Sequence, residues 1–253
     1  MRESSRKSST RDTFESLVVT VILAIFGTTF VVQAFKIPTG SMEDTLLIGD
    51  HLLVNKFALA DQPGFWRHFL PYKTIHRGDV LVFKYPSNYP SVEEQQEPGE
   101  DFVKRVIGVP GDHIRVVHRK VFVNGVQLKD SYVLNTYPDE VLPADNFPPP
   151  PNASLPGWVE DLRNYVQNGE LVVPPGRYFV MGDNRENSWD SRFWGLVPIR
   201  LVSGSPLVIY WSFETPPEEY LRTSLSDRID QMGDLIFHFF TKTRWRRTFR
   251  LVR

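Results

Sequence analysis

The sequence predicts a mostly β protein in which a single N-terminal transmembrane helix precedes an antiparallel β-sheet domain, with an inserted hairpin and loop subdomain and a C-terminal amphipathic helix. Three observations support this architecture. Short runs rich in Val, Ile, Tyr and Phe alternate with turn residues, including many of the 20 prolines. One long apolar run lies near the N-terminus. Apolar residues recur with helical spacing near the C-terminus.

Composition limits the classes of protein to consider. With 41% hydrophobic and 13% aromatic residues, the 253-residue chain can fill a globular core. The formal net charge of −1 provides no overall field to attract nucleic acid, so we expect no nucleic-acid partner. The chain has no cysteine, which excludes disulfides, zinc sites with thiolate ligands and a cysteine nucleophile.

Residues 17–35 are the expected transmembrane helix, because these 19 residues carry no charge and about 20 are needed to cross a bilayer. The alternatives are a buried core helix, which usually has a polar face, and a cleavable signal sequence, which has a shorter apolar run. Lys and Arg are concentrated in residues 1–16, so this segment is expected to be cytoplasmic. The chain after Lys36 would lie on the outer side of the membrane, because no later apolar run is long enough to cross the bilayer again.

The domain at residues 36–214 is expected to contain the strands, which the apolar runs place at about 47–57, 78–86, 101–109, 176–184 and 205–213. Pro110-Gly111 suits a type II turn, and Asn124-Gly125 between β-rich flanks predicts a hairpin. An insertion at about 113–177 would include this hairpin, a short helix at 158–166 and a proline-rich stretch from Pro143 to Pro156. We expect that stretch to be an extended surface loop without packed structure.

Residues 215–253 are expected to form an amphipathic helix followed by a basic tail. The helical spacing involves Met232, Leu235, Ile236, Phe239 and Phe240, and six of the last 12 residues are Lys or Arg. Two interpretations remain open. The helix either packs on the domain and leaves a solvated tail, or lies on the anionic surface of a membrane.

Ser41 and Lys104 are the candidate nucleophile and base. Ser41 follows Gly40 in a turn where the backbone can approach a substrate, although serine in such a turn is most often only a turn residue. Strand alternation places Lys104 on one face with Phe102 and Val106, where desolvation would lower its pKa; an edge-strand lysine that reaches water is the alternative. The six histidines form no recognisable triad with an acid.

The densest polar cluster extends from Met181 to Arg192, directly after a predicted strand. It combines carboxylates, guanidinium groups, amides and hydroxyls in one short segment flanked by apolar residues. Such groups can orient a neighbouring lysine through hydrogen bonds, whereas the alternative is a solvated, salt-bridged turn.

Four blocks of the sequence, taken in order, resemble the bacterial type I signal peptidases. They are Pro38 to Met42, Arg77-Gly78-Asp79, Lys104-Arg105 with Gly108 and Pro110-Gly111-Asp112, and Gly182 to Arg192. The resemblance extends from the apolar segment to about Trp211. It implies a membrane-anchored Ser/Lys protease, without metal or cofactor, that removes signal peptides from exported preproteins at the outer face of a bacterial cytoplasmic membrane.

The resemblance also implies a role for each matched residue. Ser41 would attack the scissile carbonyl, Lys104 would accept the serine proton, and Ser188 would orient the lysine amine. The oxyanion hole would consist of the Ser41 N–H and the hydroxyl of Thr39, a position where many relatives carry serine. Site support would come from Asp183, Asp190 and Arg192, whereas Glu186, in a position that is often aspartate, should be tolerated.

Substrate selection would depend on shallow pockets for the small residues one and three positions before the cut. Ile37, Met42 and Val103 match positions that line these pockets. Phe65, Trp66, Phe69 and Leu70 form either an apolar rim that enters the lipid bilayer or a core-packed loop. Two rival classes remain: a self-cleaving SOS-type repressor, which the absence of a DNA-binding helix pair disfavours, and a membrane-anchored binding protein that has lost activity.

Overall fold

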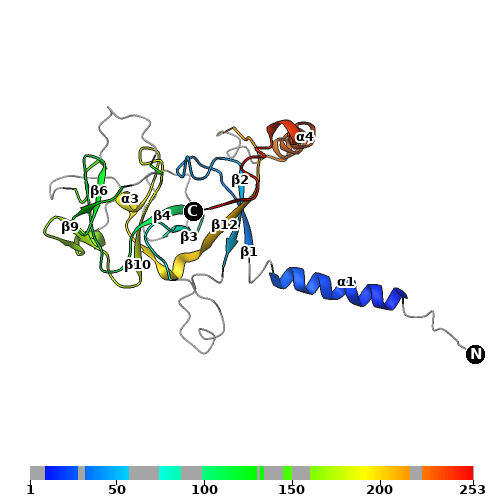
Figure 1. Cartoon of the computed structure of the whole chain (residues 1–253), viewed down its shortest axis with the longest axis horizontal. Helices are drawn as coiled ribbons and strands as arrows, with labels where there is room; N and C mark the ends of the chain where they lie inside the picture. The colour runs from blue at the N-terminus through cyan, green and yellow to red at the C-terminus, as the bar shows by residue number, and fades with distance from the viewer. Residues whose placement is uncertain are drawn as a thin grey trace, which may run out of the picture.

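The structure is a computed structural model that describes residues 9–27, 32–56, 74–86, 99–129, 132–133, 145–149, 160–216 and 224–252. Within this part of the chain, strands form two antiparallel sheets and helices are few (Figure 1). The expectation of a mostly β, antiparallel chain is therefore confirmed. The second sheet is built from residues between His113 and Val172, inside the span of 113–177 expected for an insertion.

The first sheet has eight strands in the described residues, in the order β1-β2-β12-β3-β4-β10-β11, with β13 paired to β12. Their bounds in sheet order are Val32–Lys36, Asp50–Asn55, Val202–Ser212, Val80–Lys84, Asp101–Gly108, Arg177–Met181 and Val197–Pro198, with β13 at Arg250–Leu251. β4 lies between β3 and β10, so its side chains from Lys104 onward are buried on both faces.

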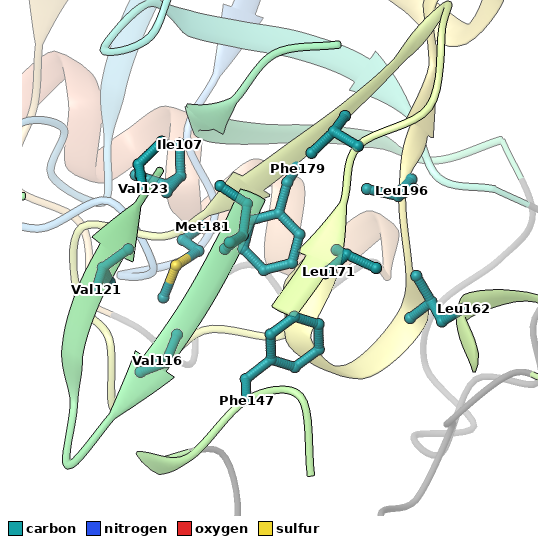
Figure 2. Close-up of a cluster of buried hydrophobic side chains, with 12 residues drawn as sticks. Ile107, Val116, Val121, Val123, Phe147, Leu162, Leu171, Phe179, Met181 and Leu196 are labelled. Atoms are coloured by element: carbon teal, nitrogen blue, oxygen red, sulfur yellow. The ribbon is translucent and has the colours of Figure 1, made fainter. Parts of the chain in front are cut away.

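The second sheet has five strands in the described residues, in the order β7-β6-β5-β9-β8. Their bounds are Val126–Gln127, Lys120–Val123, His113–Val117, Glu170–Val172 and Val166–Gln167. Alternation in β5 sends Ile114 and Val116 into a core that also contains Phe179 and Met181 of β10 (Figure 2). This shared core joins the second sheet to the first.

The helices are short or peripheral. α1 (Ser9–Phe26) and α4 (Leu225–Lys242) lie outside the two sheets (Figure 1), whereas α2 is Glu160–Arg163, α3 is Ser191–Trp194 and a 3₁₀ turn covers Ile199–Leu201. The two predicted turns have the expected backbone geometry. Gly111 has a φ of 89° with the Asp112 N–H bonded to the Val109 carbonyl, and Asn124 and Gly125 both have positive φ, as a type I′ hairpin requires.

The N-terminal helix differs from the one expected at residues 17–35. α1 begins earlier, at Ser9, and ends at Phe26, while Val32–Lys36 form strand β1 and pair with β2. Residues 32–35 were therefore wrongly assigned to a helix, because an apolar run does not by itself distinguish helix from strand and pairing with β2 makes this part a strand. Among the described residues, no helix is both long enough and apolar enough to cross a membrane.

Packing corrects one further expectation and narrows one interpretation that the sequence left open. The described part of the proline-rich stretch includes a packed residue, Phe147. It is 1% exposed, and its backbone exchanges two hydrogen bonds with Val116. Phe147 packs 5.1 Å from the Phe179 ring, so a single aromatic side chain ties the stretch to the core (Figure 2). The basic tail is not simply solvated, because Arg247 forms an ion pair with the fully buried Asp50.

Candidate active site

Ser41 lies on the turn between β1 and β2, which is anchored by its own apolar residues. Met42 and Leu46 are buried in the core of the first sheet, and the Leu46 N–H bonds to the Met42 carbonyl at 2.8 Å. The buried neighbours fix the backbone on the C-terminal side of Ser41, whose side chain is 9% exposed and faces a cleft. This rigid turn can present a hydroxyl in one orientation.

Lys104 comes from the middle of β4 and meets that hydroxyl. Its Nζ lies 2.6 Å from Ser41 Oγ, and the side chain is 4% exposed. The Phe102 ring, whose centroid is 5.7 Å from Nζ, covers the lysine from the same strand face. The structure thus brings together the two residues that the sequence singled out as nucleophile and base.

Burial lowers the pKa of Lys104 from 10.5 to about 8, because desolvation penalises the charged amine. The carboxylates of Asp190 and Asp183 oppose this effect, and the guanidinium of Arg192 adds to it. An amine with this pKa is partly neutral near pH 8 and can then accept a proton.

Gly182, at the end of β10, allows the site to close. Its N–H bonds to Asp190 Oδ2 at 3.1 Å, and a Cβ on this residue would lie 2.5 Å from the Ser41 carbonyl oxygen and 2.3 Å from Ser188 Oγ. The next but one residue, Asn184, donates its N–H to the Ser41 carbonyl at 3.1 Å. Sequence reasoning assigned Gly182 no role, although a glycine directly after a strand is a signal for close backbone approach.

Asp190 organises the segment behind Lys104. It accepts hydrogen bonds from Ser188 Oγ at 2.8 Å and from Arg192 Nε at 2.8 Å, and it caps α3. Burial raises the pKa of Asp190, but the charge and hydrogen bonds of Arg192, together with Lys104 and the Gly182 N–H, outweigh burial and lower it below 3.8. Asp190 is therefore an anion, and the hydroxyl of Ser188 is oriented toward it.

Asp183 is held in a second buried ion pair. Arg105 donates to both of its oxygens, Nε to Oδ1 at 2.8 Å and Nη2 to Oδ2 at 2.7 Å, and Thr45 donates to Oδ2 at 2.6 Å. The Arg105 Nη1 also reaches the Gly78 carbonyl at 2.7 Å. This fork joins β4, β10 and the Ser41 turn. Arg105 and Thr45 were missed from the sequence, because their partners lie far away along the chain.

The cleft in front of Ser41 has a volume of about 680 Å³. All three residues expected to line substrate pockets, Ile37, Met42 and Val103, line it, as do Thr39 and Ser188. Asp183, Asp190 and Arg192 are instead buried behind the reacting groups. No cluster of His, Cys, Asp or Glu among the described residues could hold a metal ion.

Glu186 connects the cleft to the second sheet. Arg119, in the turn between β5 and β6, donates to Glu186 Oε1 at 2.7 Å and to Asp145 at 2.9 Å. From the sequence, Glu186 was expected only to be tolerated in place of aspartate, and no role was predicted for Arg119. None of the five histidines within the described residues lines the cleft; His51 instead stacks on Trp211 with ring centroids 4.7 Å apart, and burial lowers its pKa. Phe65, Trp66, Phe69 and Leu70 lie outside the described residues.

Comparison with known proteins gives a consistent result. The family described as "Signal peptidase, peptidase S26" matches residues 10–211. A signal peptidase I of Pseudomonas fluorescens is 33% identical over 76% of this chain and 69% of its own. A signal peptidase I of Aquifex aeolicus is 35% identical over 80% of this chain and 86% of its own. A solved signal peptidase I from Enterococcus faecalis is 29% identical and covers 53% of this chain and 97% of its own, with a TM-score of 0.35.

Proposed function

The chain belongs to the signal peptidase family, peptidase S26, and is a serine peptidase, and we propose that it removes signal peptides from secretory preproteins through an acyl-enzyme on Ser41. The observation that carries this proposal is the 2.6 Å separation between Ser41 Oγ and the Nζ of the buried Lys104. A neutral amine at this distance can take the serine proton directly.

The reaction proceeds in two halves. Ser41 Oγ bonds to the scissile carbonyl carbon while its proton moves to Lys104 Nζ, and the protonated amine then gives that proton to the leaving amine as the peptide bond breaks. In the second half, a water molecule loses a proton to Lys104 Nζ as its oxygen attacks the carbonyl carbon of the ester. The bond between that carbon and Ser41 Oγ then breaks, Lys104 returns the proton to Oγ, and the carboxylic acid product leaves. Lys104 therefore accepts and donates a proton in each half. A pKa of about 8 suits this role, because the amine can then exist in both the neutral and the charged form near neutral pH.

The developing oxyanion is stabilised by the Ser41 N–H and the Thr39 hydroxyl, both of which belong to the cleft. We assign Ser188 to the orientation of the Lys104 amine. Its hydroxyl donates to Asp190 at 2.8 Å, and a hydroxyl that donates one hydrogen bond can still accept another from an amine. Asp183, Asp190 and Arg192 brace these groups from behind through the buried ion pairs.

Specificity for small residues at positions −1 and −3 follows from the wall of the cleft. Ile37 and Met42 are 3% and 1% exposed, and Val103 is packed against the same core, so these side chains limit the depth available to the substrate. A large or charged residue at either position would lose contact or bury a charge.

We also propose that the N-terminal segment attaches the enzyme to the bacterial cytoplasmic membrane. Large apolar side chains on α1, among them Leu17, Ile22, Leu23 and Ile25, are more than half exposed, an arrangement that favours lipid over water. The excess of Lys and Arg ahead of this segment places the N-terminus in the cytoplasm and the sheets outside. Protease added to intact spheroplasts should digest residues 41–253, and full protection beside a digested periplasmic control would contradict this topology.

The proposed activity is tested with purified protein in detergent and a preprotein with alanine at −1 and −3. We expect one cut after the −1 alanine, no cut when −1 is arginine, no product with Ser41→Ala, and an unchanged rate with a metal chelator. Cleavage of the arginine substrate at the same rate would contradict the proposed substrate class, and cleavage by a folded Ser41→Ala variant would contradict the proposed nucleophile.

A further inference from the structure

The C-terminal helix α4 is amphipathic, and most of its large apolar side chains point away from the domain. Ser224 caps its N-terminus, and its C-terminal end is attached to the first sheet through the Lys242 carbonyl, which accepts from the Glu214 N–H at 2.9 Å. Its partly buried positions are Asp227, Gln231, Gly233, Asp234, Leu235 and Lys242, and Phe239 stacks on Trp211 of β12. The side of the helix that is sheltered by the protein thus carries several polar residues, and only two of the large apolar side chains of α4, Leu235 and Phe239, turn toward the domain.

The opposite side of α4 is a continuous apolar stripe in contact with solvent. Ile236, Phe240 and Phe237 are 69%, 77% and 84% exposed, and the stripe also includes Leu225, Ile229 and Met232. These six residues, which we call the α4 stripe, lie largely within one helical face. Exposure of such large apolar side chains to water is energetically unfavourable, and an apolar patch of this kind is typical of a binding surface.

The surroundings of the stripe indicate the chemistry of that occupant. Trp245 and Phe249 extend the exposed apolar surface beyond the end of the helix, with Trp245 stacked on Phe240 at a centroid distance of 6.3 Å. Arg246 and Arg250 are exposed beside them. Aromatic and aliphatic side chains flanked by arginine suit the boundary between acyl chains and anionic headgroups, whereas a second copy of the chain would bring like charges together.

We propose that the α4 stripe, with Trp245 and Phe249, docks on an anionic lipid bilayer and lies in its surface. α4 and α1 both project from the sheets (Figure 1), so the enzyme has two separate membrane contacts. This inference does not depend on the proposed peptidase chemistry, because no residue of α4 lines the cleft.

The structure also determines which arginines can serve in this contact. Arg247 is paired with Asp50 at 2.6 Å, and Arg244 donates to the Ile48 carbonyl at 2.9 Å, so both stabilise the domain. Arg246 and Arg250, by contrast, are exposed. Charge reversal at Arg244 or Arg247 would damage the fold and would not report on lipid binding.

The test uses the absence of cysteine from the chain. Ile236→Cys and, as the matched polar-face control, Gln231→Cys are made in the full chain, labelled with an environment-sensitive fluorophore and incorporated into vesicles of phosphatidylglycerol and phosphatidylcholine. Lipids with a quencher in the acyl chain should quench the label at position 236 several-fold more than the label at 231. Equal quenching at the two positions would overturn the proposal. Energy transfer between labelled copies, with position 236 protected from lipid quenchers, would overturn it in favour of a dimer.

The electrostatic part has its own variant. Arg246→Gln together with Arg250→Gln, or vesicles of phosphatidylcholine alone, should reduce quenching at position 236, because both remove attraction between arginine and headgroup phosphate. Unchanged quenching in both cases would overturn the requirement for an anionic lipid. Cleavage of a soluble peptide in detergent, which does not require docking, should remain at the wild-type rate and serves as the control for folding.

Discussion

The two sheets relate to the cleft in different ways. Among the described residues, those that line the cleft belong to the first sheet or to segments that connect strands of that sheet: the Ser41 turn, the start of β4, and Glu186 to Trp189 with Phe193. The second sheet packs behind β4 and β10 through a shared apolar core and meets the cleft-lining chain at the ion pair between Arg119 and Glu186.

This difference predicts how far a perturbation travels. In the first sheet, buried ion pairs and backbone hydrogen bonds connect directly to Ser41 and Lys104, so a small displacement changes the reacting distance. In the second sheet, a substitution acts on the cleft mainly through Glu186. Substitutions should therefore separate into large catalytic effects in the first sheet and small ones in the second.

The largest effect is expected at the reacting pair. Ser41→Ala and Lys104→Arg should each lower kcat/KM by at least about 10³-fold, because arginine stays charged in proteins and cannot take the serine proton. Thermal denaturation should confirm that both variants fold. Substantial turnover by a folded Lys104→Arg variant would mean that another group supplies the base.

Gly182→Ala is expected to have the next largest effect. The added Cβ would force apart Gly182, Ser188 Oγ and the Ser41 carbonyl, at an expected cost of about 1–3 kcal/mol in stability and roughly 10²-fold in kcat/KM. Gly233→Ala is the matched control, because nothing lies within 4 Å of its Cβ position on α4. The control should keep full activity and gain slight stability. Full activity in Gly182→Ala would show that the site tolerates displacement.

The pH dependence tests the burial of Lys104. Activity requires the neutral amine, so kcat/KM should rise about tenfold per pH unit below the pKa and level off above about pH 8. Because the folded pKa is lower than that of the unfolded chain, the unfolded state binds more protons between pH 8 and 10.5, and the contribution of this group to stability should increase over that window. A rising limb near pH 10 would contradict a desolvated lysine.

The smallest effect is expected from the second sheet. Arg119→Met removes the ion pair to Glu186 and should lower kcat/KM only a few-fold, since that ion pair positions a cleft-lining carboxylate and its loss leaves the contact between Ser41 and Lys104 in place. Arg115→Met is the control, because Arg115 pairs only loosely with Glu170 on the second sheet and should leave kcat/KM unchanged. A loss in Arg119→Met as large as that in Gly182→Ala would erase the distinction between the sheets.

Local chemistry explains which parts of the fold could be predicted. The apolar run of β4, and the turn residues Pro110-Gly111 and Asn124-Gly125, act over a few positions, so these features could be predicted directly from the sequence. The prediction of a helix through residue 35 was wrong for residues 32–35, because pairing with β2 makes them a strand. The burial of Phe147 could not be predicted from the sequence either, since it depends on contacts with the distant residues Val116 and Phe179.

The sequence by itself determined the candidate nucleophile and base, the antiparallel strands and the family, because these depend on residue types at short spacing. Only the tertiary structure decided that Lys104 Nζ meets Ser41 across 63 positions of the chain, that Arg105 clamps Asp183, and that Arg247 reaches Asp50. Only it decided, too, that the apolar side of α4 faces outward. Each of these outcomes is a long-range contact or a choice of face, and both arise when distant segments pack and bury their charges together.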